Sequence, residues 1–237
     1  MNQECLSLSA RFQVVTRCAA VASALMLFGG QVLSQGNGAI VGVVTTKVPG
    51  ARPVRVTIDQ RVCGNEVQDE TVVADGAGHL ANAVVTLVGV KARGGNAAAS
   101  GVMNEKCRFS PHVQIVRPSA VLTTSSSDPI LHTTNAQNEA GKSFFNVAVP
   151  VPGIRINKPV GGAGIVRLSC NTHPWMKGWV VVTDEVAVVT GADGTFSLPD
   201  VPAGTYEVRV WHESLKGAPQ TVVVSAGTPA KVSFDLR

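Results

Sequence analysis

The chain has 237 residues, a formal net charge of +4 and 15% charged residues. Its lysines and arginines form no cluster with interleaved aromatic residues, so the charge pattern argues against nucleic-acid binding. Short apolar runs recur between glycine and proline turn signals, and after residue 34 none keeps a helical period. This pattern predicts an all-β fold in which antiparallel strands pack as sandwiches.

Residues 1–34 have the pattern of a secretory signal peptide. Arg11 and Arg17 form a basic start, an apolar run follows over residues 18–28, and residues 32–34 suit a cleavage site. The apolar run is shorter than the ~20 residues that a membrane-spanning helix needs. We therefore expect export to the periplasm or the extracellular space, with no stable membrane insertion after signal cleavage. An uncleaved anchor is the alternative.

Residues 38–108 are expected to form an N-terminal β segment. Strands are predicted at residues 40–44, 54–58 and 84–88, and Asp75-Gly76 predicts a turn between the last two. Residues 94–101 are small and polar, which predicts a loop.

Export makes the cysteine count informative. Cys5 and Cys18 leave with the signal peptide, so Cys63, Cys107 and Cys170 remain. In an oxidising compartment two of these three should pair. Cys63 and Cys107 have no metal-ligating neighbours at short spacing and are the predicted disulfide, which leaves Cys170 as a free thiol. The alternative is that Cys170 pairs with one of the other two.

Residues 109–184 contain the next group of predicted strands, at residues 112–116, 120–123, 144–149, 165–170 and 179–182. In the strand that ends at Cys170, Val166 and Leu168 alternate with polar residues. Side chains two residues apart lie on the same face of a strand, so the Cys170 side chain should point into the protein.

The loop after this strand carries the motif C-x-x-H-x-x-M, formed by Cys170, His173 and Met176. Thiolate, imidazole and thioether are the ligands that select copper, and a blue-copper site also needs a second histidine. His132 is the preferred second histidine. His112 is the alternative, although its distance from Cys170 in the sequence is longer.

This loop resembles the copper-binding loop of cupredoxins, most closely that of the amicyanin type, and the interval from His132 to Cys170 is also similar. The resemblance implies a Greek-key sandwich that binds one type 1 copper through His132, Cys170, His173 and Met176. It also implies that His173 is the solvent-side ligand and the electron port. On the same loop, Pro174 and Trp175 would form an apolar patch that contacts partner proteins. Core packing is the alternative role for Trp175.

One position departs from the cupredoxin pattern. Members of the family usually have asparagine after the first histidine ligand, where it ties the two ligand segments together. Thr133 stands at this position. The tie is therefore either missing or made by a hydroxyl group.

Residues 185–237 are expected to form a third unit. They contain D-G-x-F at Asp193–Phe196 and P-x-G-x-Y at Pro202–Tyr206. These motifs resemble those of the carboxypeptidase regulatory-like module, a transthyretin-type β-sandwich. The stretch is shorter than that module usually is. Either the N-terminal segment completes it, with the cupredoxin-like part inserted, or the whole chain is one composite sandwich.

The sequence therefore predicts an exported one-electron carrier that contains copper and works between redox partner proteins, such as a cytochrome or a dehydrogenase. One alternative is a copper-binding or copper-delivery protein without redox turnover. Another is an extracellular, carbohydrate-binding-like β-sandwich with a vestigial metal loop. A structural zinc site is disfavoured, because methionine is a poor zinc ligand.

An enzyme is not expected. None of the five histidines forms the His-x-His pairs of multicopper oxidases, and no phosphate-binding glycine loop occurs. His79 should be solvated in its turn, and His212 should be a polar residue at a strand end.

Overall fold

The computed structural model describes residues 36–93 and 100–237. The predicted signal peptide and most of the predicted loop at residues 94–101 lie outside these residues. Within the described ranges, no helix is long and apolar enough to cross a membrane.

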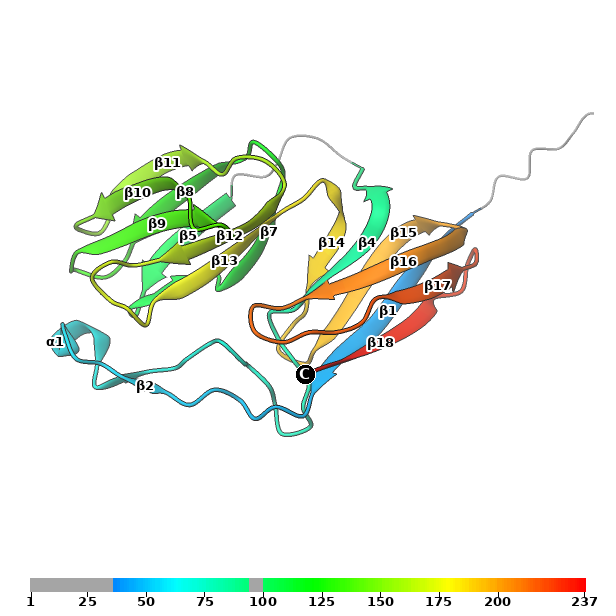
Figure 1. Cartoon of the computed structure of the whole chain (residues 1–237), viewed down its shortest axis with the longest axis horizontal. Helices are drawn as coiled ribbons and strands as arrows, with labels where there is room; N and C mark the ends of the chain where they lie inside the picture. The colour runs from blue at the N-terminus through cyan, green and yellow to red at the C-terminus, as the bar shows by residue number, and fades with distance from the viewer. Residues whose placement is uncertain (1–35, 94–99) are drawn as a thin grey trace, which may run out of the picture. The chain divides into compact units, whose positions relative to one another are not determined.

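The fold is all-β, as predicted. Eighteen strands and a single four-residue helix make up the regular structure of the described residues. The strands form two sandwiches, each with its own hydrophobic core, together with one short two-stranded ribbon (Figure 1).

The first sandwich contains a five-stranded sheet in the order β10-β9-β12-β13-β7 and a four-stranded sheet in the order β11-β8-β5-β6. Its strands are β5 (Ser100–Glu105), β6 (Arg108–Ser110), β7 (Val113–Val116), β8 (Val121–Ser126), β9 (His132–Asn138), β10 (Ser143–Val149), β11 (Arg155–Pro159), β12 (Gly164–Ser169) and β13 (Lys177–Val182).

The core of the first sandwich is formed by side chains from both sheets. Phe109 and Leu122 come from the four-stranded sheet and Leu168 and Val180 from the five-stranded sheet, and all four are buried. Along β12, Leu168 is buried and the adjacent Arg167 is exposed, which is the predicted alternation. The chain therefore leaves β12 with the next inward-facing position at residue 170.

The second sandwich combines strands from both ends of the chain. It contains a three-stranded sheet in the order β15-β1-β18 and a four-stranded sheet in the order β14-β4-β16-β17. Its strands are β1 (Asn37–Thr46), β4 (Val84–Lys91), β14 (Glu185–Val189), β15 (Thr195–Pro202), β16 (Gly204–Trp211), β17 (Gln220–Val224) and β18 (Ala230–Leu236).

The expected N-terminal segment at residues 38–108 is not a separate unit in this structure. Its strands β1 and β4 pair with C-terminal strands, whereas β5 and β6 belong to the first sandwich. Of the two arrangements left open by the sequence, the structure has the one in which the first sandwich is inserted into the second.

Three strand pairs are parallel, which the sequence analysis did not predict. They are β1 with β18, β5 with β8, and β7 with β13. Parallel neighbours need a long connection between them, and short-range turn signals cannot reveal such a connection.

The two-stranded ribbon belongs to an excursion between β1 and β4. It pairs β2 (Val54–Arg55) with β3 (Glu66–Val67), and the helix α1 (Gln60–Cys63) lies between them in the sequence. The predicted strand at residues 54–58 is therefore much shorter than expected: pairing ends at Arg55, and the helix begins at Gln60 after Asp59, which has a left-handed φ of 55°. We call residues 54–67 the cover segment.

The cover segment packs on the first sandwich. Its buried side chains Val56, Cys63 and Val67 belong to the same hydrophobic cluster as Phe109 and Leu168. These apolar contacts hold an otherwise irregular stretch of chain against the end of the sandwich that carries the predicted ligands.

Candidate metal centre

The C-x-x-H-x-x-M loop connects two paired neighbours. Strands β12 and β13 are antiparallel and pair from Gly164 with Val182 to Ser169 with Lys177, so the loop is closed tightly at its base. Inside it, the Met176 N–H donates to the His173 carbonyl at 2.9 Å. The two flanking strands and this turn hold the ligand positions in place.

His132 reaches the loop because β9 is the other neighbour of β12. The two strands pair up to Ser169 with Asn135, which brings the start of β9 beside Cys170. Single potential ligand atoms of His132, Cys170 and His173 all lie within 4.8 Å of one another. The distance from Cys170 Sγ to His173 Nδ1 is 3.6 Å. The structure thus brings together residues that are up to 41 positions apart, since 173 − 132 = 41.

The cluster is closed to solvent. The exposed fraction is 0% for His132 and His173, 1% for Met176 and 4% for Cys170. The Met176 side chain lies in the same buried hydrophobic cluster as Cys170. A buried set of thiolate, imidazole and thioether groups matches the ligand preferences of copper.

The electrostatics favour the thiolate form of Cys170. Burial alone raises the pKa of this thiol, but the imidazole of His132 and the backbone N–H of Thr133 outweigh it and lower the pKa from 9.0 to about 5. The thiolate is the form of cysteine that binds metals. Among the described residues, Cys170 is also the one free cysteine, because Cys63 and Cys107 form a disulfide.

Both imidazoles are oriented by carboxylates on their outer nitrogens. His132 Nε2 lies 3.0 Å from Asp128 Oδ2, and His173 Nε2 lies 3.0 Å from Asp59 Oδ2. An Nε2–H that donates to a carboxylate leaves the Nδ1 lone pair for a metal ion.

The inner nitrogen of His132 supports the same conclusion. His132 Nδ1 is buried and has no hydrogen-bond partner among the described residues. Leaving a buried polar atom without a partner is costly, and such an atom calls for an explanation. A metal ion among His132, Cys170 and His173 supplies that explanation, so the residues present fit a bound copper ion.

Thr133 ties the two ligand segments together through its hydroxyl. Thr133 Oγ1 accepts a hydrogen bond from the Asn171 N–H at 2.7 Å and lies 3.7 Å from Cys170 Sγ, to which it donates. The Thr133 N–H also donates to Cys170 Sγ, at 3.3 Å. Of the two possibilities that the sequence left open, the structure has the hydroxyl-mediated tie.

We expect Thr133→Val to weaken this tie while keeping the side-chain shape. The Asn171 N–H loses its acceptor, at a cost of about 1 kcal/mol of unfolding free energy. The sulfur loses one donor, which should lower the reduction potential of the copper-loaded protein, because donors stabilise the more negative sulfur of the reduced state. Urea unfolding and redox titration measure both effects. Thr133→Ser keeps the hydroxyl and is the control. If Thr133→Val has the same unfolding free energy and the same reduction potential as Thr133→Ser, the assignment of the tie is contradicted.

His173 differs from the expectation that it is the solvent-side ligand. It is fully buried, its outer nitrogen is covered by Asp59, and its ring lies 5.2 Å from that of Trp175. The cover segment occupies the place where solvent was expected. Of the expected partner patch, Pro174 is exposed, whereas Trp175 is half-buried and donates its Nε1–H to the Cys107 carbonyl at 3.1 Å.

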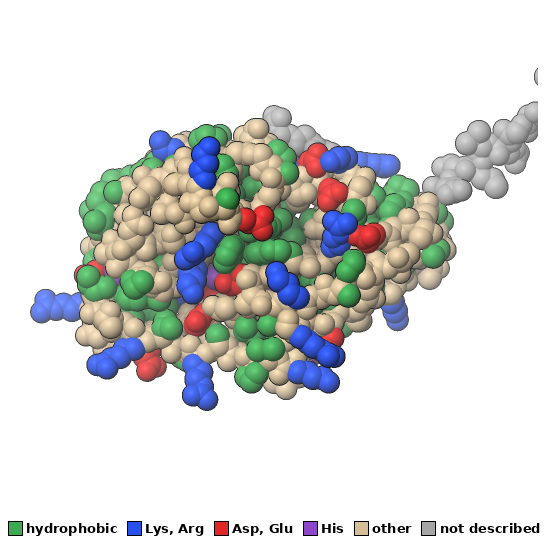
Figure 2. Space-filling view, in the orientation of Figure 1, with side chains coloured by type: hydrophobic (Ala, Val, Ile, Leu, Met, Phe, Trp, Pro, Cys, Tyr) green, Lys and Arg blue, Asp and Glu red, His purple; other side chains and the backbone are tan. Residues whose placement is uncertain are grey.

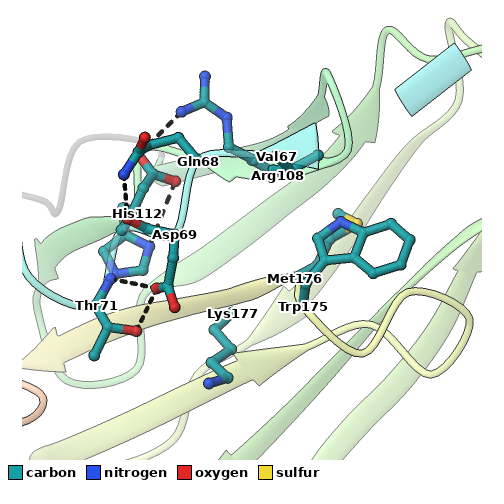
Figure 3. Close-up of a pocket in the computed structure, with 10 residues that line it drawn as sticks. Val67, Gln68, Asp69, Thr71, Arg108, His112, Trp175, Met176 and Lys177 are labelled. Atoms are coloured by element: carbon teal, nitrogen blue, oxygen red, sulfur yellow. Dashed lines mark hydrogen bonds and ion pairs between the residues drawn. The ribbon is translucent and has the colours of Figure 1, made fainter. Parts of the chain in front are cut away.

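His112, the alternative ligand, lies outside this cluster. Its Nε2 contacts Glu213 Oε1, and its Nδ1 is 3.8 Å from Glu70. Figure 3 shows His112 on one side of a pocket, with Trp175 and Met176 on the other side. Carboxylates therefore occupy the surroundings of His112.

The C-terminal motifs have clear structural roles. In the turn before β15, Asp193 Oδ1 accepts hydrogen bonds from the Thr195 N–H and hydroxyl. Phe196 packs in the core, and the Tyr206 hydroxyl donates to the Pro202 carbonyl at 2.9 Å. Residues 163–237 match the family model of the carboxypeptidase regulatory-like domain. The expected resemblance of the C-terminal unit is thereby confirmed.

The matched region begins before the expected boundary at residue 185. It includes β12, the ligand loop and β13, whose hydrogen-bonded neighbours all belong to the first sandwich. The strands that complete the carboxypeptidase regulatory-like sandwich, β1 and β4, lie outside the matched residues.

No curated protein matches the chain. Among solved structures, a purple cupredoxin from Nitrosopumilus maritimus has 19% identity and a TM-score of 0.32, with coverage of 35% of this chain and 99% of that chain. Amicyanin from Paracoccus versutus has 18% identity and a TM-score of 0.33, with coverage of 42% and 97%. A copper-containing nitrite reductase from Thermus scotoductus has 19% identity and a TM-score of 0.31, with coverage of 41% and 25%.

The carboxypeptidase regulatory-like part contains His212, which directly follows β16 and is buried. His212 Nδ1 accepts from the backbone N–H groups of Ser214 and Leu215, so this histidine closes the turn after β16. Burial lowers the pKa of His212. His79, by contrast, is partly exposed and pairs with Asp75.

The two carboxylates beside His132 and His173 were not predicted from the sequence. Asp128 precedes His132 by four residues, and this spacing was an available signal. Asp59 precedes His173 by 114 residues, and the sequence contains no signal that links them. Only the packing of the cover segment brings this second pair together.

Proposed function

We propose that this protein is an exported type 1 copper protein that carries one electron at a time between redox partner proteins. The observation that carries the proposal is the buried convergence of His132, Cys170 and His173, in which Nδ1 of His132 has no hydrogen-bond partner among the described residues. Met176 is placed on the same loop to complete the ligand set.

The protein residues would hold the metal and keep its surroundings fixed. His132, Cys170, His173 and Met176 would be the ligands, and bound copper would supply one-electron redox chemistry. The carboxylates of Asp59 and Asp128 hold both imidazole rings, and the Thr133 backbone and hydroxyl hold the sulfur. A frame that moves little keeps the reorganisation barrier of electron transfer small, and the closed cluster excludes water.

The proposed partners are proteins of the cytochrome or dehydrogenase type, met in the periplasm or outside the cell. On the face shown in Figure 2, basic and acidic side chains are interspersed, with apolar groups between them. Such a mixed surface suits brief protein encounters better than the binding of a polyanion. The proposed role is electron transfer between proteins. It involves no substrate turnover, so we propose no enzymatic reaction.

One observation favours a second candidate, a copper-binding or copper-delivery protein without redox turnover. His173, the expected electron port, is fully buried beneath the cover segment. A closed site holds a metal ion well but lengthens the path for electrons to a partner. The two candidates share all ligands and differ in the rate of electron exchange.

The proposal is tested by loading the mature protein with Cu(II) and recording the visible spectrum. We expect an intense thiolate-to-copper charge-transfer band that disappears on reduction and is absent in Cys170→Ser. A protein that binds no copper tightly would contradict both candidates. A blue protein that exchanges electrons only slowly with a small soluble cytochrome would support the copper-holding role over the carrier.

A further inference from the structure

Asp59 stands out among the groups around the site because of where it comes from. Its carboxylate lies 3.0 Å from His173 Nε2, yet it is 114 positions away in the sequence and belongs to neither sheet of the first sandwich. The Asp59 side chain is 36% exposed, whereas His173 is completely buried. Asp59 therefore stands between this imidazole and solvent.

Several independent contacts fix the position of Asp59. Its carbonyl accepts hydrogen bonds from the N–H groups of Val62 and Cys63 in α1, at 2.9 and 3.0 Å. The Val56 N–H donates to the Asn65 carbonyl at 2.9 Å, which closes the base of the cover segment. The disulfide from Cys63 joins the segment to the first sandwich.

Within the described residues, the Asp59 carboxylate makes no hydrogen bond to its own segment. Asp59 is the N-cap residue of α1, but its side chain makes no capping hydrogen bond there. It instead points at the outer nitrogen of His173. Its left-handed backbone, with φ of 55°, is one that aspartate, asparagine and glycine tolerate better than other residues.

We propose that Asp59 is a positioning residue for the copper site: it accepts the Nε2–H of His173, fixes the ring so that Nδ1 faces the metal, and makes the imidazole a stronger ligand for Cu(II). This inference rests on the proposed function. A carboxylate behind a metal-ligating histidine fixes the tautomer and raises ligand basicity, and loss of such a partner typically lowers metal affinity ~10–100-fold.

Two substitutions separate charge from hydrogen bonding. Asp59→Asn keeps an acceptor oxygen and suits the left-handed backbone, but it removes the negative charge. Asp59→Gly removes both and also accepts the positive φ. Glu66→Gln is the matched control, because it makes the same charge change on an exposed side chain of the same cover segment.

The first measurement uses the metal-free protein and observes the His173 ring by 1H–15N NMR. In the native chain and in Glu66→Gln, we expect an Nε2–H signal protected from exchange with water. In Asp59→Gly the protection should be lost. An Nε2–H signal that is equally protected in Asp59→Gly would overturn the inference, whether or not the protein binds copper.

The second measurement is the Cu(II) affinity and the reduction potential of the loaded proteins. We expect Asp59→Asn to bind Cu(II) ~10–100-fold more weakly and to have a higher potential than Glu66→Gln. Each tenfold loss for Cu(II) relative to Cu(I) raises a one-electron potential by about 59 mV. Equal affinity and potential in the two variants would overturn the electronic part of the inference.

The two measurements distinguish a failure of the proposed function from a failure of the inference about Asp59. If the native chain binds no copper, the proposed function fails, and the NMR result still decides whether Asp59 positions His173. If the native chain shows the charge-transfer band and Asp59→Asn behaves as the control does, the proposed function stands and the inference about Asp59 fails.

Discussion

Removal of the Cys63–Cys107 disulfide is expected to lower the free energy of unfolding by about 4 kcal/mol. The bond joins residues that are 44 positions apart, and a cross-link of this span restricts the unfolded chain strongly. In the folded state it fastens α1 in the cover segment to the turn between β5 and β6. Its loss should therefore affect both the whole fold and the cover over His173.

The test is a Cys63→Ser/Cys107→Ser double variant, compared with the native chain by urea unfolding. We also expect faster loss of bound copper to a chelator, because the cover segment would lose its covalent link to the sandwich and keep only non-covalent contacts, such as those of Val56, Val67 and Asp59. Cys170→Ser keeps the disulfide and serves as the unfolding control. An unchanged unfolding midpoint would show that the cross-link does not restrict the unfolded chain as the loop-entropy argument requires.

The sequence predicted those parts of the site that depend on local order. Spacing and alternation along β12 placed Cys170 inward, and the short loop to Met176 kept three ligand types together. The all-β fold followed from turn signals and apolar runs. These features depend on neighbours in the sequence, so a periodic pattern contains them.

The remaining features depend on which distant segments pack together. The pairing of β1 and β4 with C-terminal strands and the parallel strand pairs have no local signature. The burial of His173 results from the cover segment, whose apolar residues Val56 and Val67 look like those of an ordinary strand. A residue such as Asp59 becomes functional only through that packing.

Asp128→Ala is expected to lower the free energy of unfolding by about 3–5 kcal/mol, a typical cost of breaking a buried charged network. The buried Asp128 carboxylate accepts the N–H groups of Lys106 and Cys107, each at 2.8 Å, as well as contacting His132. Both hydrogen-bonded residues have left-handed backbones, with φ of 50° and 56°. One side chain therefore supports the turn that carries the disulfide and also orients a predicted ligand.

This dual contact predicts that stability and copper binding decline together. In Asp128→Ala, two backbone N–H groups and the His132 ring lose their acceptor, so urea unfolding and Cu(II) affinity should both be reduced. Asp128→Asn keeps one acceptor oxygen and should be intermediate. The exposed Asp235, which pairs with Arg237, provides the control Asp235→Ala, for which little change is expected. If Asp128→Ala unfolds at the same urea concentration as this control, the carboxylate does not support the turn. If Asp128→Ala is less stable but binds Cu(II) as tightly as the native chain, the orientation of His132 depends on the packing of β9 rather than on Asp128.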